Sequence, residues 1–430
     1  MSLATQTEPA IAHCQNCGAE VAPDADHCAV CGKLLRERST KITLVVTLLL
    51  ILAGIALTQY FVNLHRVTEQ DLAHRWFTRG NEAMQANAPK FAADAYRTAL
   101  NYDRENEEYR LRLAQALLAD GRLAEAHAHL VGLWEEEPAN GEVNLTLAQL
   151  DARRGHSSTA IRYYNDAING VWQNSPRKHR TEARFELVRY LLQQQKPAGA
   201  QAELLALLAD APSDPPDQLQ LGNMLLEVNE PAHALQAFNT LLSKDETNAQ
   251  AWLGASRANL ALGKYAEAEQ AGAKAVEHDP NLPSAREQLE LTREILRANP
   301  AIRGLPLAER ASRVASAFDA ALKRLRTCAV EKSIDLAAPA NAVITSGSQG
   351  ATNGAESTPP PSALQLLYAS GVQKQPDATE KALRKDPDAL EPAMQYVFEV
   401  ERAAAPICPD MSLADQALLI LAQHENETVK

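Results

Sequence analysis

One long uncharged run stands out in the pattern of polar and apolar residues along the chain. Residues 42–64 read ITLVVTLLLILAGIALTQYFVNL, with Lys41 before the run and His65 after it. As a helix, the Ile42–Val62 part would be about 30 Å long, which matches the hydrocarbon thickness of a bilayer. We therefore predict a transmembrane helix over 42–64. The alternatives are a buried helix of a soluble domain, for which no comparably apolar partner stretch exists, and a cleaved signal peptide, which the preceding polar residues disfavour.

Downstream, the apolar pattern repeats with a period of 34 residues. Alanine recurs in steps of 34, 34, 40, 34 and 34 residues, at Ala92, Ala126, Ala160, Ala200, Ala234 and Ala268. The long step contains an insertion, SPRKHR, at 175–180. Two antiparallel helices that stack on the next pair produce such a period. We predict six helix pairs and a capping helix, over 73–106, 107–140, 141–174, 181–214, 215–248, 249–282 and 283–298.

This pattern resembles the tetratricopeptide repeat family over about half of the chain. The residues that match the family pattern best, in the first and fifth repeats, are Trp76, Gly80, Ala92, Tyr96, Ala99, Leu100, Leu221, Gly222, Leu225, Ala234 and Phe238. The resemblance implies an α-solenoid in which the first helix of each pair lines a concave groove. One groove-facing row would then be Asn81, Gln115, Gln149, Arg189, Asn223 and Arg257.

Every residue of this row is capable of hydrogen bonding, so the row would bind the backbone or carboxylates of an extended peptide. The alternative is a solvated face. The lysine-rich clamp that some family members use for C-terminal carboxylates is not matched. A second, apolar row either lines the groove or packs between helices: Phe77, Leu111, Leu145, Phe185, Leu219 and Leu253.

The residues after the repeats predict more helices. Three- and four-residue spacing of apolar side chains within 299–336 predicts an amphipathic helix from about Pro306 to Lys332. Its other face is basic and either solvated or in contact with lipid headgroups: Arg310, Arg313, Lys323, Arg324 and Arg326. Small residues and prolines over 337–363 predict a disordered linker. A helical tail over 364–430 follows, with a capping arrangement of Ser412 and Asp415 before its last helix.

Composition supports a mainly α fold and narrows the classes of function. Hydrophobic residues make up 46% of the chain but aromatic residues only 5%, and alanine and leucine supply the difference. These two residues favour helices over strands. The net charge of −12 argues against a general binder of nucleic acid or anionic lipid. No phosphate-binding glycine loop, Gly-x-Ser-x-Gly or His-Glu-x-x-His motif is present, so we predict that the protein is not an enzyme.

The head of the chain carries four of the six cysteines. Two Cys-x-x-Cys pairs, Cys14/Cys17 and Cys28/Cys31, are ten residues apart, and a glycine follows each pair. Four thiolates close a tetrahedral shell around Zn²⁺ at about 2.3 Å. Over about 20 residues, this segment resembles the short zinc-ribbon family found at the N-termini of many bacterial proteins.

We predict a ribbon over 1–35 in which structural zinc supplies the folding energy, with disulfides as the alternative. His13 and His27 would be neighbours of the ligands. The ribbon has no basic face, so nucleic acid is not an expected partner.

Charge and cysteine usage together indicate an orientation across the membrane. Lys33 and the basic juxtamembrane segment 36–41, with Arg36, Arg38 and Lys41, precede the span, whereas only Arg66 lies in the first nine residues beyond it. This bias favours a cytoplasmic N-terminus, although over 15 residues the count becomes four against three. A reducing cytosol preserves metal-binding thiols and an oxidising compartment suits a disulfide.

Cys328 and Cys408 are the two cysteines beyond the span. A bond between them would close a loop of about 80 residues and stabilise the tail by up to about 4 kcal/mol. Two free buried thiols are the alternative.

These predictions describe a single-pass scaffold or adaptor of a bacterial inner membrane, whose extracytoplasmic solenoid binds a protein or peptide. The bacterial source is inferred from the resemblance of the arrangement of ribbon, span and repeats. One alternative is a membrane-tethered regulator whose ribbon docks on nucleic acid or a protein in the cytosol. Another is a noncatalytic subunit of an envelope enzyme complex.

Overall fold

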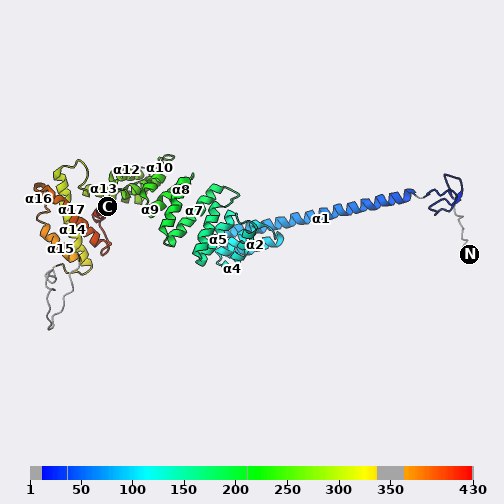
Figure 1. Ribbon diagram of the computed structural model, residues 1–430, viewed down its shortest axis with the longest axis horizontal. Coiled ribbons are helices and arrows are strands. Elements are labelled where there is room, and N and C mark those ends of the chain that lie inside the picture. Colours follow the sequence, from blue (N-terminus) through cyan, green and yellow to red (C-terminus); the bar gives the residue numbers. More distant parts are fainter. Residues whose placement is uncertain (1–11, 36, 211, 337–362, 429–430) are drawn as a thin grey trace, which may run out of the picture. The chain divides into compact units, whose positions relative to one another are not determined.

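The computed structural model describes residues 12–35, 37–210, 212–336 and 363–428. The chain divides into two compact units, Met1–Asn174 and Ser175–Lys430. Among its described residues, the first unit contains two short strands and six helices, β1 (Ala12–His13), β2 (Glu20–Val21), α1 (Glu37–Gln85), α2 (Pro89–Tyr102), α3 (Glu107–Ala119), α4 (Leu123–Glu136), α5 (Gly141–Arg154) and α6 (Ser157–Asn169) (Figure 1).

Helix α1 joins the apolar run to the first helix pair without a break. No glycine or proline interrupts residues 55–79, and the stretch after the apolar run carries two ion pairs at four-residue spacing. His65 Nε2 lies 3.3 Å from Glu69 Oε1, and Arg75 Nη2 lies 2.7 Å from Asp71 Oδ2. Such pairs favour helix in exposed segments. The helix therefore continues past the predicted end of the span at Leu64.

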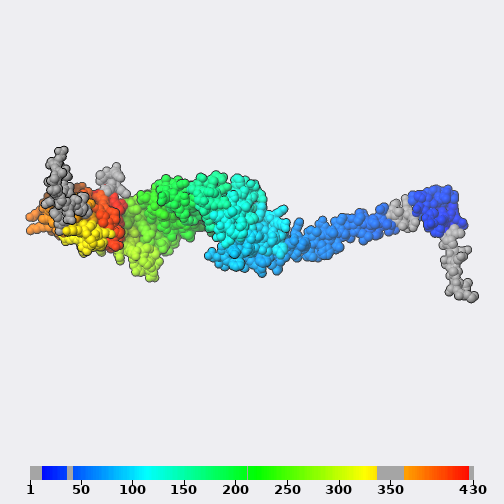
Figure 2. Space-filling view, turned by 90° about the horizontal axis from the view of Figure 1, so that it is seen from below, coloured from blue at the N-terminus to red at the C-terminus, as the bar shows by residue number. Residues whose placement is uncertain are grey.

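The apolar part of α1 is uncovered. From Ile42 onward α1 is long and apolar enough to cross a membrane by length and composition, and its most apolar 18-residue window has a mean hydropathy of 2.3. None of that window is buried within the structure, and Figure 2 shows a surface of this helix that no other part of the described chain covers. The candidate span is thus a single solvent-exposed helix.

The helices of the first unit pack in antiparallel succession, each against the next from α1 to α6. Their shared core contains Ala92 and Ala126 of the recurring alanines and the rings of Phe77, Tyr96 and Tyr109. Gly80 allows α1 and α2 to approach closely, because a Cβ there would overlap the Tyr96 ring. Gly80 stands twelve positions before Ala92, and a larger residue there would push the two helices apart.

The second unit continues the succession of helix pairs and ends in a helical tail. Its elements are α7 (Pro176–Gln193), α8 (Pro197–Asp210), α9 (Pro215–Glu227), α10 (Pro231–Leu242), α11 (Ala249–Ala261), α12 (Tyr265–His278), α13 (Pro283–Ala298), α14 (Leu307–Glu331), α15 (Ala363–Lys374), α16 (Glu380–Lys385), the 3₁₀ helix η2 (Pro387–Ala389), α17 (Leu390–Ala404) and α18 (Leu413–Thr428). The insertion at 175–180 lengthens α7 instead of forming a loop. Pro176 starts the helix because its fixed φ suits the first helical turn.

The tail packs on the end of the repeats. Helix α13 packs against both α12 and α18, and α14, α15, α16, α17 and α18 share one core. Tyr265 of α12 shares a 2.7 Å hydrogen bond with His424 Nδ1 of α18. The predicted linker falls at 337–362, outside the described residues, and Ala363 already begins α15. The short α16 and η2 have no counterpart in the sequence-based prediction.

Candidate functional site

The N-terminal ribbon consists of two knuckles with the same backbone geometry. In each one, the glycine N–H donates to the carbonyl of the first cysteine, from Gly18 to Cys14 and from Gly32 to Cys28, both at 2.8 Å. Both glycines have φ of +72°, which L side chains rarely adopt. Strands β1 and β2 pair antiparallel beside the first knuckle. The sequence pattern Cys-x-x-Cys-Gly therefore folds into a turn that aims both sulfurs inward.

The four sulfurs converge on one point. The Sγ atoms of Cys14, Cys17, Cys28 and Cys31 all lie within 4.8 Å of one another. The Cys14–Cys31 distance is 3.6 Å and the Cys17–Cys28 distance is 3.4 Å. Tetrahedral Zn²⁺ with bonds of about 2.3 Å places its sulfurs about 3.8 Å apart. The donor set and its spacing thus fit a structural zinc ion without an open coordination position, and His13 and His27 are not part of the cluster.

The protonation of the cluster is uneven in the absence of metal. Hydrogen bonding to the backbone of Lys33 is the main cause that lowers the pKa of the Cys31 thiol to about 6. For Cys17, hydrogen bonding to the Ala19 backbone lowers the pKa, but contacts with Cys28 and Cys31 outweigh it and raise the value to about 12. Zinc binding would therefore have to displace protons shared among the thiols, so its affinity should depend on pH.

In the first unit, two of the three predicted groove residues line one hollow. This hollow of about 420 Å³ is lined by Phe77, Asn81, Met84, Gln85, Tyr96, Glu108, Arg112 and Gln115. The Tyr96 hydroxyl donates a 2.7 Å hydrogen bond to Asn81 Oδ1, which leaves the Asn81 amide N–H groups free for a ligand. Gln149 is half-buried on α5 and does not line this hollow.

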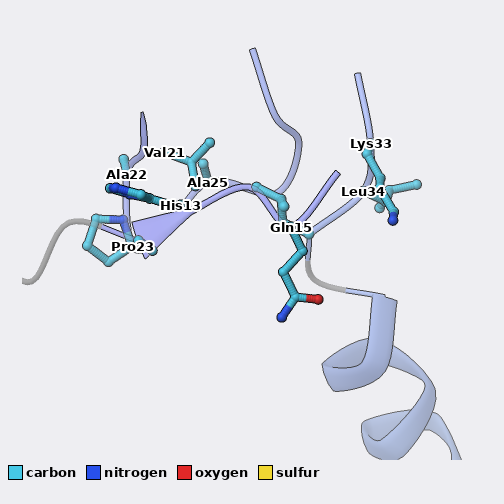
Figure 3. Close-up of a pocket in the computed structure, with 10 residues that line it drawn as sticks. His13, Gln15, Val21, Ala22, Pro23, Ala25, Lys33 and Leu34 are labelled. Atoms are coloured by element: carbon cyan, nitrogen blue, oxygen red, sulfur yellow. The ribbon is translucent and has the colours of Figure 1, made fainter. Parts of the chain in front are cut away.

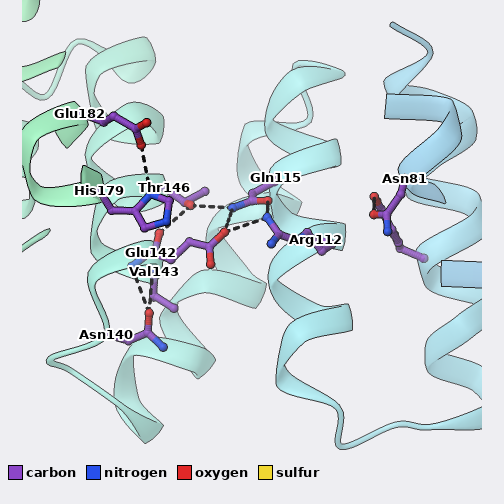
Figure 4. A network of polar contacts seen from close by, with 10 residues as sticks. Asn81, Arg112, Gln115, Asn140, Glu142, Val143, Thr146, His179 and Glu182 are labelled. Atoms are coloured by element: carbon purple, nitrogen blue, oxygen red, sulfur yellow. Dashed lines mark hydrogen bonds and ion pairs between the residues drawn. The ribbon is translucent and has the colours of Figure 1, made fainter. Parts of the chain in front are cut away.

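Gln115 is already engaged within the chain, as Figure 4 shows. Its Oε1 accepts from Arg112 Nη1 at 2.9 Å, and its Nε2 donates to Glu142 Oε1 at 3.1 Å. Arg112 also pairs with Glu142 at 2.7 Å. The sequence reasoning missed Arg112 and Glu142. The three-residue spacing of Arg112 and Gln115 places both side chains on one helix face, and this spacing could have indicated their contact.

In the second unit, all three predicted groove residues are exposed. Arg189 lines a hollow of about 570 Å³ together with Leu192, Gln193, Gln220, Met224 and Glu227, whereas Asn223 and Arg257 lie outside its lining. Within the described residues, neither Arg189 nor Arg257 takes part in an ion pair. These two guanidinium groups therefore remain available to a ligand.

The apolar row packs between helices. Phe77, Leu111, Phe185 and Leu253 are buried and the other two members are half-buried. The Phe77 ring stacks on the Tyr109 ring, with centroids 4.7 Å apart. The row therefore mainly packs between helices, and Phe77 also lines the hollow of the first unit.

The structure brings the two distal cysteines together. Cys328 of α14 and Cys408 of the α17–α18 loop form a disulfide with a Cα–Cα distance of 5.8 Å, and both residues are buried. The predicted capping arrangement is also present, because the Ser412 N–H donates to Asp415 Oδ2 at 2.9 Å and the Asp415 N–H donates to Ser412 Oγ at 3.3 Å.

The predicted basic face of α14 is wrong at two positions. The Arg324 side chain is only 4% exposed, and it lies 3.1 Å from Glu401 and 3.2 Å from Asp415. Arg324 Nη2 also donates to the Cys408 carbonyl at 2.8 Å. Arg313 donates to carbonyls at the C-terminal end of α13. The tail supplies the partners of Arg324, whereas the end of α13 supplies the acceptors of Arg313.

Family comparisons support the assignment of the repeats. Residues 117–170 and 219–283 match family models described as tetratricopeptide repeat. The protein is therefore a mainly helical protein with a tetratricopeptide-type solenoid and C-terminal helices. A comparison with curated proteins finds no match.

Solved structures similar to this chain include PilF of Pseudomonas aeruginosa, which is 17% identical with a TM-score of 0.36 over 51% of this chain and 97% of the other. PilW, described as a type IV pilus biogenesis factor, is 19% identical with a TM-score of 0.37 over 50% and 96%. The C-terminal part of a repeat protein from Cytophaga hutchinsonii is 14% identical with a TM-score of 0.41 over 55% and 92%.

Proposed function

We propose that the protein is a membrane-anchored, noncatalytic scaffold whose repeat grooves bind an extended segment of a protein partner. The observation that carries this proposal is that residues of the polar row line hollows on the first helices of the pairs. Asn81 lines the hollow of the first unit and Arg189 that of the second. Amide and guanidinium groups supply donors to a peptide backbone or to carboxylates.

The anchor in this proposal is the Ile42–Leu64 part of α1. Because α1 continues into the first helix pair, the span and the wall of the first hollow belong to one helix. We place the ribbon in the cytoplasm and the repeats outside the inner membrane of a bacterium. Cation bias before the span supports this orientation, as does the contrast between four clustered thiols and one disulfide.

Site-specific photo-crosslinking in cells tests the groove. A photoreactive amino acid at Gln85 or Gln193, both exposed beside the hollows, should capture the same partner protein, identified by mass spectrometry. Asn81→Ala should reduce capture at Gln85, and Arg189→Ala should reduce capture at Gln193. Arg297→Ala is the matched control, because this arginine is 76% exposed outside both hollows. Equal capture by a probe at Arg97, on α2 and outside the lining of both hollows, would refute the groove as the binding surface.

A further inference from the structure

The zinc ribbon exposes large apolar side chains next to the chain segment that enters α1. Val30 is 74% exposed, Leu34 49% and Leu35 36%. Leu34 and Leu35 line a hollow of about 350 Å³ together with Val21, Pro23 and six further residues. Figure 3 shows Lys33 and Leu34 on one side of this hollow and Pro23 on the other. Within the described residues, these apolar side chains remain exposed to solvent.

The covalent distance from this edge to the candidate span is short. Leu35 is two residues before Glu37, where α1 begins, and two peptide units reach at most about 7.6 Å. The five helical residues from Glu37 to Ile42 rise about 7.5 Å. Leu35 therefore lies within about 15 Å of the hydrocarbon core, whereas the headgroup layer itself is roughly 5–8 Å thick. The connecting chain therefore keeps Leu35 within about 10 Å of the outer edge of the headgroup layer.

The local charge near this edge differs from that of the whole protein. Lys33 is followed in the sequence by Arg36, Arg38 and Lys41, with Glu37 the one acidic residue among them. Cations at this position are attracted by anionic headgroups. The four acidic residues of the ribbon segment 1–35, Glu8, Glu20, Asp24 and Asp26, oppose contact with nucleic acid and leave its apolar side chains as the main contact surface. The net charge of −12 argues against general lipid binding, but not against a tethered contact beside a span.

We infer that the ribbon lies on the membrane, with Leu34, Leu35 and Val30 inserted among the lipid headgroups and Lys33 beside the phosphates. The inference rests on the proposed membrane anchor. It assigns the bilayer interface, and no soluble macromolecule, as the partner of this edge. The zinc knuckles then hold the apolar edge in shape, because a ribbon this small has no core of its own.

Photo-crosslinking of the full-length, zinc-loaded chain in liposomes tests the inference. The liposomes contain phosphatidylcholine with phosphatidylglycerol, and single photoreactive residues replace Leu34, Val30, Asn16 or Leu49. Mass spectrometry then quantifies phospholipid adducts, and zinc content per chain confirms that each ribbon is folded. We expect severalfold more adduct at Leu34 and Val30 than at Asn16, the exposed polar tip of the first knuckle. Lys33→Glu should lower the adduct at Leu34 severalfold in these liposomes and little in pure phosphatidylcholine.

The outcomes separate the inference from the proposed anchor. Adducts at Leu49 without an excess at Leu34 and Val30 over Asn16 would overturn the inference and leave the anchor standing. A missing adduct at Leu49, in the middle of the candidate span, would overturn both.

Discussion

Replacing Arg324 by methionine tests the account of the tail. Methionine keeps much of the side-chain length but removes the guanidinium that faces Glu401 and Asp415 and hydrogen-bonds the Cys408 carbonyl. Both Arg324 and Glu401 are almost fully buried. Removing Arg324 leaves the Glu401 carboxyl, the Asp415 carboxylate and the Cys408 carbonyl without their shared partner, and breaking such a buried contact typically costs about 3–5 kcal/mol.

The expected effect is local and large. At 1.36 kcal/mol per factor of ten, a loss of 3 kcal/mol raises the opening equilibrium of α17 and α18 by at least about 100-fold. Hydrogen exchange of amides in these two helices, read by mass spectrometry on the detergent-solubilised chain, measures this directly. Lys323→Met is the matched control, since Lys323 is the exposed neighbour on the same helix and surface changes usually stay within about 0.5 kcal/mol.

Equal exchange in Arg324→Met and Lys323→Met would refute the reasoning. It would mean that the buried charges contribute nothing beyond what packing of the tail supplies. Faster exchange over the whole chain in Arg324→Met would also count against it, because the contacts of Arg324 reach only the tail helices and the loop between them.

Burial is the main cause that raises the pKa of Glu401 to about 8, above a carboxyl's ordinary value near 4.3, so its stabilising contribution is complete below about pH 4 and is lost as pH rises through about 8. Stability of the tail should therefore fall as pH rises from about 4 to about 8 and level off above that, and Glu401→Gln should flatten that profile; an unchanged slope would contradict the assignment. Gly222→Ala should destabilise the second unit by about 1–3 kcal/mol in urea denaturation, because the added Cβ would lie 2.5 Å from the buried Phe238 ring. Gly132→Ala is the contrasting variant. It adds a Cβ in open space on a helix and should stabilise the first unit by about 0.5–1 kcal/mol. Reduction of the Cys328–Cys408 bond, which closes a separation of 80 residues, should lower the free energy of unfolding by up to about 4 kcal/mol, and a double alanine variant should show no response to reductant. Chelation of zinc should unfold the ribbon while the helices remain folded. Circular dichroism measures this: loss of the helix signal together with the strand signal would show that the folding of the helices depends on the ribbon.

Local patterns in the sequence predicted most of the helices. The apolar period placed the six helix pairs, and the capping helix 283–298 coincides with α13. The amphipathic helix ends within a residue of its predicted limits. Two boundaries differ because helix continues where the sequence contains nothing to stop it, at residues 65–72 of α1 and at the insertion that starts α7. Period and composition predict where helices form better than where they end.

The candidate sites also differ in how far local sequence patterns could predict them. Cys14, Cys17, Cys28 and Cys31 converge because Cys-x-x-Cys-Gly is a local turn motif, so spacing alone predicted the cluster. The groove row was chosen by analogy between repeats, but the six positions do not have equal access to a ligand. Gln115 is held by Arg112 and Glu142 of two different helices, and no local pattern encodes contacts between residues 27 positions apart.

By itself, the sequence determined the elements: an apolar span, a four-thiol knuckle pair, a 34-residue helical period and an amphipathic helix that carries Cys328. Each depends on residues close together in the chain, where periodicity and spacing act directly. Only the tertiary structure decided the surroundings of those elements. It buried Arg324 against Glu401 and the Cys408 loop, and it left Leu34 exposed in the segment that precedes α1. The physical reason is that burial and partners depend on segments distant in sequence, which pack together only in the folded chain.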